Sequence, residues 1–312
     1  MTISDIPADA LPFADDLFSQ PPGRPQEERD QWKRRLITHP YTGEKVPWTA
    51  VTTFLGALKD SEGLLKWTGR MIVTGLGMDE ALWVRAAGTD PGDTRSLDQI
   101  AEDAKRGAGA FAGANLGTAL HGFQDRVDRG EDSRVPTKYV SDVEAYKAEM
   151  ARQALEPDAR FAERFVLIPK YRLIGRIDGA WWRPEGLEDH QQNAELHLGD
   201  RKTKQSRKSW YEEACQLGLY SLATHFYDPE KNTTEPIAPA LAERAGDGPK
   251  YELTGRPWNM NAGIVIHAPA GSATCQTYWA NLKLGRQVAE VAHALRVLRT
   301  KKDYVRPMEP LA

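Results

Sequence analysis

Cysteine is scarce in this chain, and the shortage excludes several kinds of site. Only two cysteines occur, Cys215 and Cys275. Two thiols cannot supply the four ligands of a structural zinc site or of an iron–sulfur cluster. They also give no indication of a disulfide framework.

Long hydrophobic runs are absent as well. No stretch of about 18 consecutive apolar residues occurs, so the sequence predicts no membrane span. The first residues, MTISDIPADALPF, lack the basic segment and the apolar core of a secretory signal. We therefore expect a cytoplasmic protein that does not act at a membrane.

No excess of one charge sign marks the chain as a whole. It carries 41 Lys and Arg residues against 44 Asp and Glu residues, a formal net charge of −3. This balance does not by itself indicate nucleic-acid binding, although a basic groove can exist within a neutral total. Because 40% of the 312 residues are hydrophobic, the chain can bury a sizeable core.

Composition divides the chain into an arm and one domain. Residues 1–45 are rich in Pro, Asp, Glu, Arg and Gln, which predicts a partly flexible N-terminal arm. Residues 46–312 are expected to form a single domain, helical over about 46–160 and rich in strands over about 161–300. Residues 228–261 are rich in Pro and Gly and are interpreted as an excursion that the core does not need.

Helical spacing is clearest in the segment NLGTALHGFQDRVDRG. One of its stripes is apolar and consists of Leu116, Leu120, Phe123 and Val127. The neighbouring stripe is polar and consists of His121, Gln124, Asp125 and Asp128. The segment therefore predicts an amphipathic helix with one polar face.

Three further helices are predicted. One is expected to begin at Ser141, which would form a capping box with Glu144. Another is expected to begin after Ser209 and to extend through SWYEEACQLGLYSLATHFY. The last carries an apolar stripe at alternating steps of four and three: Leu284, Val288, Val291, Leu295 and Leu298.

Strand-like runs lie between these helices. FAERFVLIP and KYRLIGRIDGAWW read as a hairpin around Pro169-Lys170, and AELHLGDRKTK, GIVIHAP and ATCQTYW as further strands. The order of elements predicts an α/β (α+β) fold. We expect a central mixed β-sheet flanked by helices, with an N-terminal helical extension.

Charged side chains stand at the ends of two of these strands. Asp178 ends the run LIGRIDG, and strand alternation places Asp200 and Lys202 on one face of LGDRKTK. Carboxylates are the ligands that Mg²⁺ prefers, and a lysine beside a metal-bound water can orient that water. The three residues predict a site that hydrolyses phosphodiesters.

These residues also resemble the active-site motif of the PD-(D/E)XK nuclease superfamily. GRIDG followed by LGDRKTKQ is similar to its RecB-type branch, and VTTFLGAL with LLKW resembles the start of phage-encoded exonucleases of that group. Two helical motifs agree with the resemblance: Gly117 with His121 upstream, and Gln216 with Tyr220 downstream. The resemblance covers about residues 46–298.

The resemblance implies a restriction-endonuclease-like core that cleaves DNA with Mg²⁺ or Mn²⁺. It implies metal ligation by His121, Asp178, Asp200 and the backbone carbonyl of Arg201. Lys202 would be the catalytic lysine, and Gln216 and Tyr220 would position substrate or the carboxylates. Some relatives carry four cysteines for an iron–sulfur cluster, which this chain lacks.

Basic residues follow the motif. Lys204, Arg207 and Lys208, together with Arg201 and Lys202, give a local positive excess that would bind DNA phosphates. Glu163 begins a predicted strand and is interpreted as an exposed strand end.

The functional prediction is an exonuclease that acts on DNA ends in recombination, repair or replication, in the host cytoplasm if a phage encodes it. A recombination or single-strand-binding protein is a conceivable partner. A structure-specific endonuclease and a non-catalytic DNA-end-binding protein remain alternatives. The sequence does not define polarity, strand preference or oligomeric state.

Overall fold

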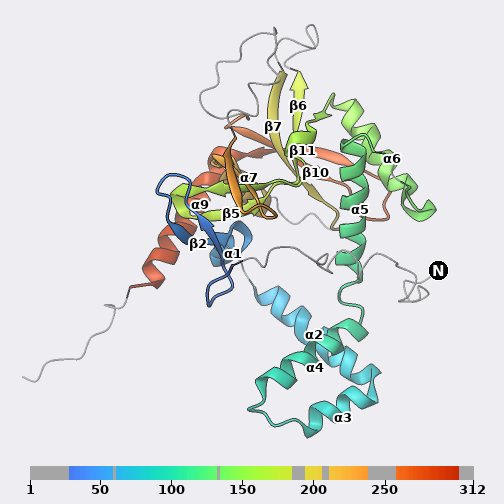
Figure 1. Cartoon of the computed structure of the whole chain (residues 1–312). Helices are drawn as coiled ribbons and strands as arrows, with labels where there is room; N and C mark the ends of the chain where they lie inside the picture. Colours follow the sequence, from blue (N-terminus) through green and yellow to red (C-terminus); the bar gives the residue numbers. More distant parts are fainter. Residues whose placement is uncertain are drawn as a thin grey trace, which may run out of the picture.

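The computed structural model describes residues 28–58, 61–131, 134–184, 194–205, 211–237 and 258–301. Figure 1 shows a body of two β-sheets flanked by helices, with a helical extension at its lower end. This arrangement confirms a mixed α/β chain. It differs from the expectation in one respect, because the strands form two sheets rather than one central sheet.

The first sheet has the strand order β1-β2-β5-β4-β8-β9. Its strands are β1 (Arg35–Thr38), β2 (Lys45–Ala50), β4 (Phe165–Ile168), β5 (Leu173–Arg176), β8 (His225–Asp228) and β9 (Thr233–Pro236). The predicted hairpin is present, because β4 pairs with β5 antiparallel across the short 3-10 turn Pro169–Tyr171. Among the described strands of this first sheet, β2 and β5 form the single parallel pair.

The second sheet has the strand order β11-β10-β7-β6-β3. Its strands are β3 (Glu156–Pro157), β6 (Gly179–Pro184), β7 (Ala194–Lys202), β10 (Ala262–His267) and β11 (Gln276–Asn281). Strand β7 lies at its centre, antiparallel to β6 and parallel to β10. One face of β7 places Leu196 and Leu198 in the main hydrophobic core.

Helices cover these sheets and build the extension. In chain order they are α1 (Val51–Leu55), α2 (Glu62–Met78), α3 (Glu80–Gly88), α4 (Thr94–Gly107), α5 (Ala112–Asp128), α6 (Thr137–Arg152), α7 (Tyr211–Tyr220) and α9 (Leu282–Arg299). Short 3-10 turns occur at Gly56–Leu58 and Ala159–Phe161. Helices α7 and α9 pack on each other, and α5 packs on α6. None of the described helices is both long and apolar enough to cross a membrane.

The helical extension consists of α2, α3 and α4, which lie below the body in Figure 1. Its buried core is small and consists of Leu82, Ile100 and Ala104. Gly75 lets α2 approach α4 closely, because a Cβ there would meet the carbonyl oxygen of Ala104. The extension is therefore held by a few contacts rather than by a deep core.

Two predicted helix boundaries are wrong. Helix α6 begins at Thr137 after Pro136, so Ser141 lies inside the helix and cannot cap it. Helix α7 ends at Tyr220, and the following residues His225–Asp228 form β8 instead of continuing the helix. The apolar run around Phe226 matches either period, and pairing with β4 decides for a strand.

The two segments set apart by composition contribute to the fold where they are described. Residues Arg35–Thr38 of the expected arm form β1, which pairs with β2. In the expected excursion, Thr233–Pro236 forms β9, and Ile237 and Trp258 are buried in the main core. The core therefore uses both ends of this segment; residues 238–257 lie outside the described part.

Candidate metal centre

Asp178 lies at the point where the chain changes sheets. It stands between β5 of the first sheet and β6 of the second, after the fully buried Ile177. The backbone N–H of Arg201 donates to the Asp178 carboxylate (2.7 Å), and the Arg201 guanidinium donates to the Asp178 carbonyl (2.9 Å). Strand β7 thus fixes both the side chain and the backbone of Asp178.

Three side chains converge beside this point: His121, Glu163 and Asp178. Each offers one ligand atom, and these atoms all lie within 4.8 Å of one another. The three residues come from α5, from the turn before β4, and from the β5–β6 junction. All are half-buried, so the cluster is both supported and accessible.

A carbonyl oxygen completes the same group. The His121 Nε2 atom lies 2.9 Å from the Arg201 carbonyl oxygen. Ligands at right angles around a metal with bonds of about 2.1 Å are about 3 Å apart, and opposite ligands about 4.2 Å apart. The limit of 4.8 Å for the three side-chain atoms and the 2.9 Å between His121 and the Arg201 carbonyl are close to these ligand spacings.

Glu163 is the residue that the sequence interpretation missed. It was expected at an exposed strand end, but its side chain is only 26% exposed and lies in the cluster. The β4–β5 register pairs Phe165 with Arg176, which places Glu163 opposite Asp178. The predicted hairpin contained this signal, because extending its pairing by two residues brings the two carboxylates together.

Asp200 and Lys202 point to the face of β7 opposite the Arg201 side chain, towards α7, and Asp178 lies close enough for its charge to act on Asp200. The Lys202 Nζ lies 2.6 Å from Asp200 Oδ2, and Gln216 Nε2 donates to Asp200 Oδ1 (3.3 Å). Gln216 also donates to the hydroxyl of Tyr220 (3.4 Å), which is buried. The structure thus brings together the Asp-x-Lys residues and the helical pair Gln216 and Tyr220.

The charges of this region raise several pKa values. Burial, followed by the negative charge of Asp178, raises the pKa of Asp200 to about 7. Burial alone would lower the pKa of Lys202, but the charge and hydrogen bond of Asp200 raise it above its usual value. Both raised pKa values are typical of a buried site with more carboxylates than cations.

His121 shows the opposite shift. Burial lowers the pKa of its imidazole below the usual value, although the nearby Asp178 opposes this effect. The ring is therefore neutral at pH 7, the form that binds metals.

Arg201 lies beneath the cluster and is almost fully buried, at 2% exposure. Its guanidinium contacts Asp128 (3.2 Å), Glu163 (3.6 Å) and Asp125 (3.8 Å). The sequence interpretation counted Arg201 among the DNA-binding cations, and this was wrong because three carboxylates surround it. Two features of the sequence indicated that Arg201 is a buried partner of carboxylates: strand alternation points it away from Asp200 and Lys202, and the polar stripe of α5 carries Asp125 and Asp128.

The upstream glycine of the helical motif also has a packing role. A Cβ at Gly117 would lie 2.5 Å from the Thr203 hydroxyl, so a larger residue there would force the Thr203 side chain to move and glycine favours the close approach of α5 to the end of β7. This approach places His121, one turn further along α5, beside the Arg201 carbonyl. The spacing of Gly117 and His121 is thereby explained by geometry.

Of the three residues expected to bind DNA, the structure describes only Lys204. Lys204 is about half exposed and forms an ion pair with the buried Glu213 (2.7 Å). Arg207 and Lys208 lie outside the described residues.

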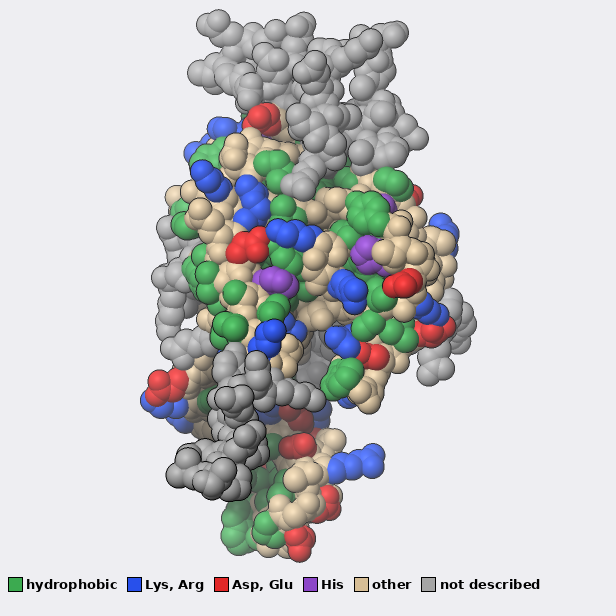
Figure 2. Space-filling model, turned by 90° about the vertical axis from the view of Figure 1, so that its left-hand side faces the viewer, with side chains coloured by type: hydrophobic (Ala, Val, Ile, Leu, Met, Phe, Trp, Pro, Cys, Tyr) green, Lys and Arg blue, Asp and Glu red, His purple; other side chains and the backbone are tan. Residues whose placement is uncertain are grey.

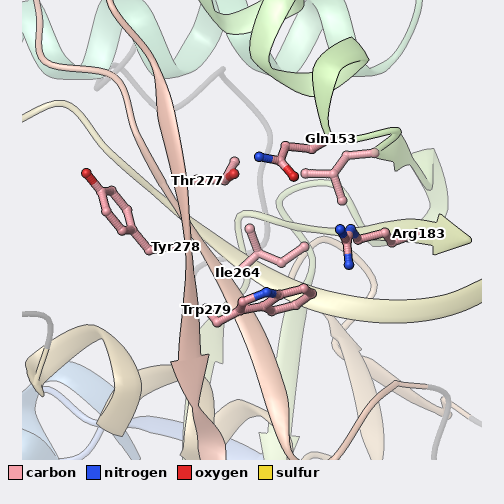
Figure 3. A pocket seen from close by; sticks show the side chains of 7 residues that line it. Gln153, Arg183, Ile264, Thr277, Tyr278 and Trp279 are labelled. Atoms are coloured by element: carbon pink, nitrogen blue, oxygen red, sulfur yellow. The ribbon is translucent and has the colours of Figure 1, made fainter. Parts of the chain in front are cut away.

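A cavity of about 80 Å³ lies elsewhere, beside the end of α6. Figure 3 shows its lining, with Gln153, Arg183, Ile264 and Trp279 around the hollow and Tyr278 pointing to the other side of β11. None of the candidate site residues lines this cavity.

Comparison with known proteins adds nothing to this site. The chain matches no protein-family model, and no curated protein matches it at a significant level.

Proposed function

We propose that this protein is a divalent-metal-dependent deoxyribonuclease that hydrolyses phosphodiester bonds from DNA ends. The observation that carries the proposal is the convergence of His121, Glu163, Asp178 and the Arg201 carbonyl, with Asp200 and Lys202 on the same strand. The resemblance to the RecB-type branch of the PD-(D/E)XK nucleases supports the same reading.

The donor set favours hard or borderline divalent cations. His121, Glu163, Asp178 and the Arg201 carbonyl would hold the ion, and Asp200 would join them once its contact with Lys202 loosens. Oxygen donors suit Mg²⁺, and one imidazole makes Mn²⁺ equally suitable. When bound, the ion would polarise a phosphate oxygen and lower the pKa of a water molecule.

The chain's own residues supply the remaining functions. Lys202 keeps its proton at Nζ because Asp200 raises its pKa, so it offers N–H donors to a phosphate oxygen. Gln216 holds one oxygen of Asp200 and leaves the other facing Lys202. This pair therefore positions a cation beside the scissile phosphate, where negative charge increases during the reaction.

Asp200→Asn is the decisive variant. We expect it to abolish cleavage of end-labelled linear DNA with Mg²⁺ and with Mn²⁺, because it removes a carboxylate ligand while keeping the side-chain volume. Glu62→Gln is the matched control, since Glu62 is exposed on α2, pairs there with Lys66 and does not belong to the candidate metal centre. Near-normal cleavage by Asp200→Asn would end the proposal.

Circular DNA separates the finer readings. An exonuclease degrades linear DNA and leaves a closed circle intact, whereas a structure-specific endonuclease cuts branched circles. Binding to ends without cleavage in either metal would instead indicate a non-catalytic end-binding protein. Testing both strand forms also defines the strand preference.

A further inference from the structure

The final helix α9 packs on the body through Leu282 and small residues, with Val288 half-buried against the core, and leaves several large hydrophobic side chains exposed. Its buried face comprises Leu282, Gly285, Ala289 and Ala292. A Cβ at Gly285 would meet the Ala214 carbonyl, so the small residues allow α7 and α9 to lie in close contact. After Leu282, no large hydrophobic side chain of α9 is fully buried.

Large hydrophobic side chains recur at every seventh residue along the exposed face of α9. Leu284, Val291 and Leu298 stand seven residues apart and are 55%, 60% and 51% exposed. Gln287 and Ala294 lie between them and are exposed too. Leu284, Val291 and Leu298 thus form one line of apolar side chains over about 21 Å of helix, which corresponds to one of the two apolar positions of a heptad. A helix that served only the core of this protein would place these residues inside.

The charges beside this seam select the partner. Lys283 stands at one end, and Arg299 and Lys301 at the other, all exposed. The only carboxylate of α9, Glu290, already contacts Lys170 and Tyr171. A second copy of this chain would bring basic ends together in either orientation, which is unfavourable. Figure 2 shows this side of the molecule, where hydrophobic side chains lie among Lys and Arg side chains.

We propose that the outer face of α9 binds an α-helical segment of a partner protein that carries hydrophobic residues at heptad spacing, flanked by Asp and Glu. The apolar residues of that segment would cover Leu284, Val291 and Leu298, and its carboxylates would pair with the cations at the two ends. This inference does not depend on the nuclease proposal, because none of the α9 residues belongs to the candidate metal centre.

A designed peptide tests this surface on the full chain. The probe is a labelled amphipathic peptide of about 21 residues, six turns of helix, with Leu at the a and d positions and Glu at e and g. A second peptide replaces every Glu with Lys, and a third replaces every Leu with Ser. We expect only the first to bind in fluorescence anisotropy and to gain helicity in circular dichroism. Added salt should weaken this binding.

Variants of exposed residues locate the binding. Val291→Glu and Leu298→Glu should each weaken the acidic peptide about tenfold or more, roughly 1.4 kcal/mol. Val73→Glu is the matched control, because Val73 is 72% exposed on α2 and should change binding less than about twofold.

Four results would overturn the inference. One is equal binding of the acidic and basic peptides, and another is unchanged affinity in both α9 variants. The third is a dimer in light scattering that Val291→Glu converts to monomer, because the seam would then belong to a second copy. Loss of DNA binding in the α9 variants with unchanged peptide affinity would likewise assign the face to DNA.

Discussion

Replacing Arg201 with methionine is expected to destabilise the fold strongly. Its guanidinium is buried among Asp125, Asp128 and Glu163. Its removal leaves the buried Asp128 without this cation, whereas Asp125 still pairs with Arg129 and Glu163 with Arg176. Removing one partner of a buried ion pair costs about 3–5 kcal/mol, a large part of the 5–15 kcal/mol that is typical of a domain. The measurement is urea unfolding at pH 7, followed by far-UV circular dichroism and tryptophan fluorescence.

Two companion variants make this prediction specific to charge. Arg201→Lys keeps a cation but loses the forked donors that hold Asp178, so we expect an intermediate cost of about 1–2 kcal/mol. Adding Asp128→Asn to Arg201→Met should recover at least about 1 kcal/mol, because it removes the buried carboxylate that lost its cation. A loss below about 1 kcal/mol in Arg201→Met, or strict additivity in the double variant, would refute the reasoning.

Three other perturbations follow from the site. Burial raises the pKa of Asp128 from 3.8 to about 6, so the folded state binds more protons than the unfolded state between about pH 4 and 6. Wild-type stability should therefore fall by about 3 kcal/mol relative to Asp128→Asn as pH rises through that window, and a pH-independent difference in urea unfolding would contradict this. Burial and the charge of Asp178 raise the pKa of Asp200 to about 7, so Mn²⁺ must displace a proton from Asp200 below that pH. The Mn²⁺ affinity measured by calorimetry should therefore rise with pH, by up to about tenfold per pH unit below pH 7, and binding should release protons. An affinity independent of pH would speak against Asp200 as a ligand. Gly175→Ala places a Cβ 2.2 Å from the ring of the buried Tyr220 and should lower the free energy of unfolding by about 1–3 kcal/mol, measured by thermal or urea unfolding. The control Gly122→Ala has open space around its Cβ on α5 and should leave the free energy of unfolding unchanged or raise it by up to about 1 kcal/mol. Equal effects of the two variants would show that the contact with Tyr220 does not matter.

The hairpin and the helical motifs were predictable because local chemistry defines them. Pro169 and the flanking apolar runs specify the β4–β5 turn, and the spacing of Leu120 and Phe123 specifies α5. The start of α6 and the end of α7 were not predictable in this way. Helix α6 begins directly after Pro136, four residues before Ser141. The residues around Phe226 pair with β4 as a strand, although their spacing also fits a helix.

By itself, the sequence identified the candidate site residues: Asp178 at a strand end, Asp200 with Lys202 on one face, and His121 on a polar helix stripe. The tertiary structure decided how they meet. The chain changes sheets at Asp178, and this crossing brings Glu163 into the cluster and buries Arg201 beneath it. The physical reason is that strand alternation fixes the direction of a side chain locally, whereas the partner it meets depends on pairings and packing between distant segments.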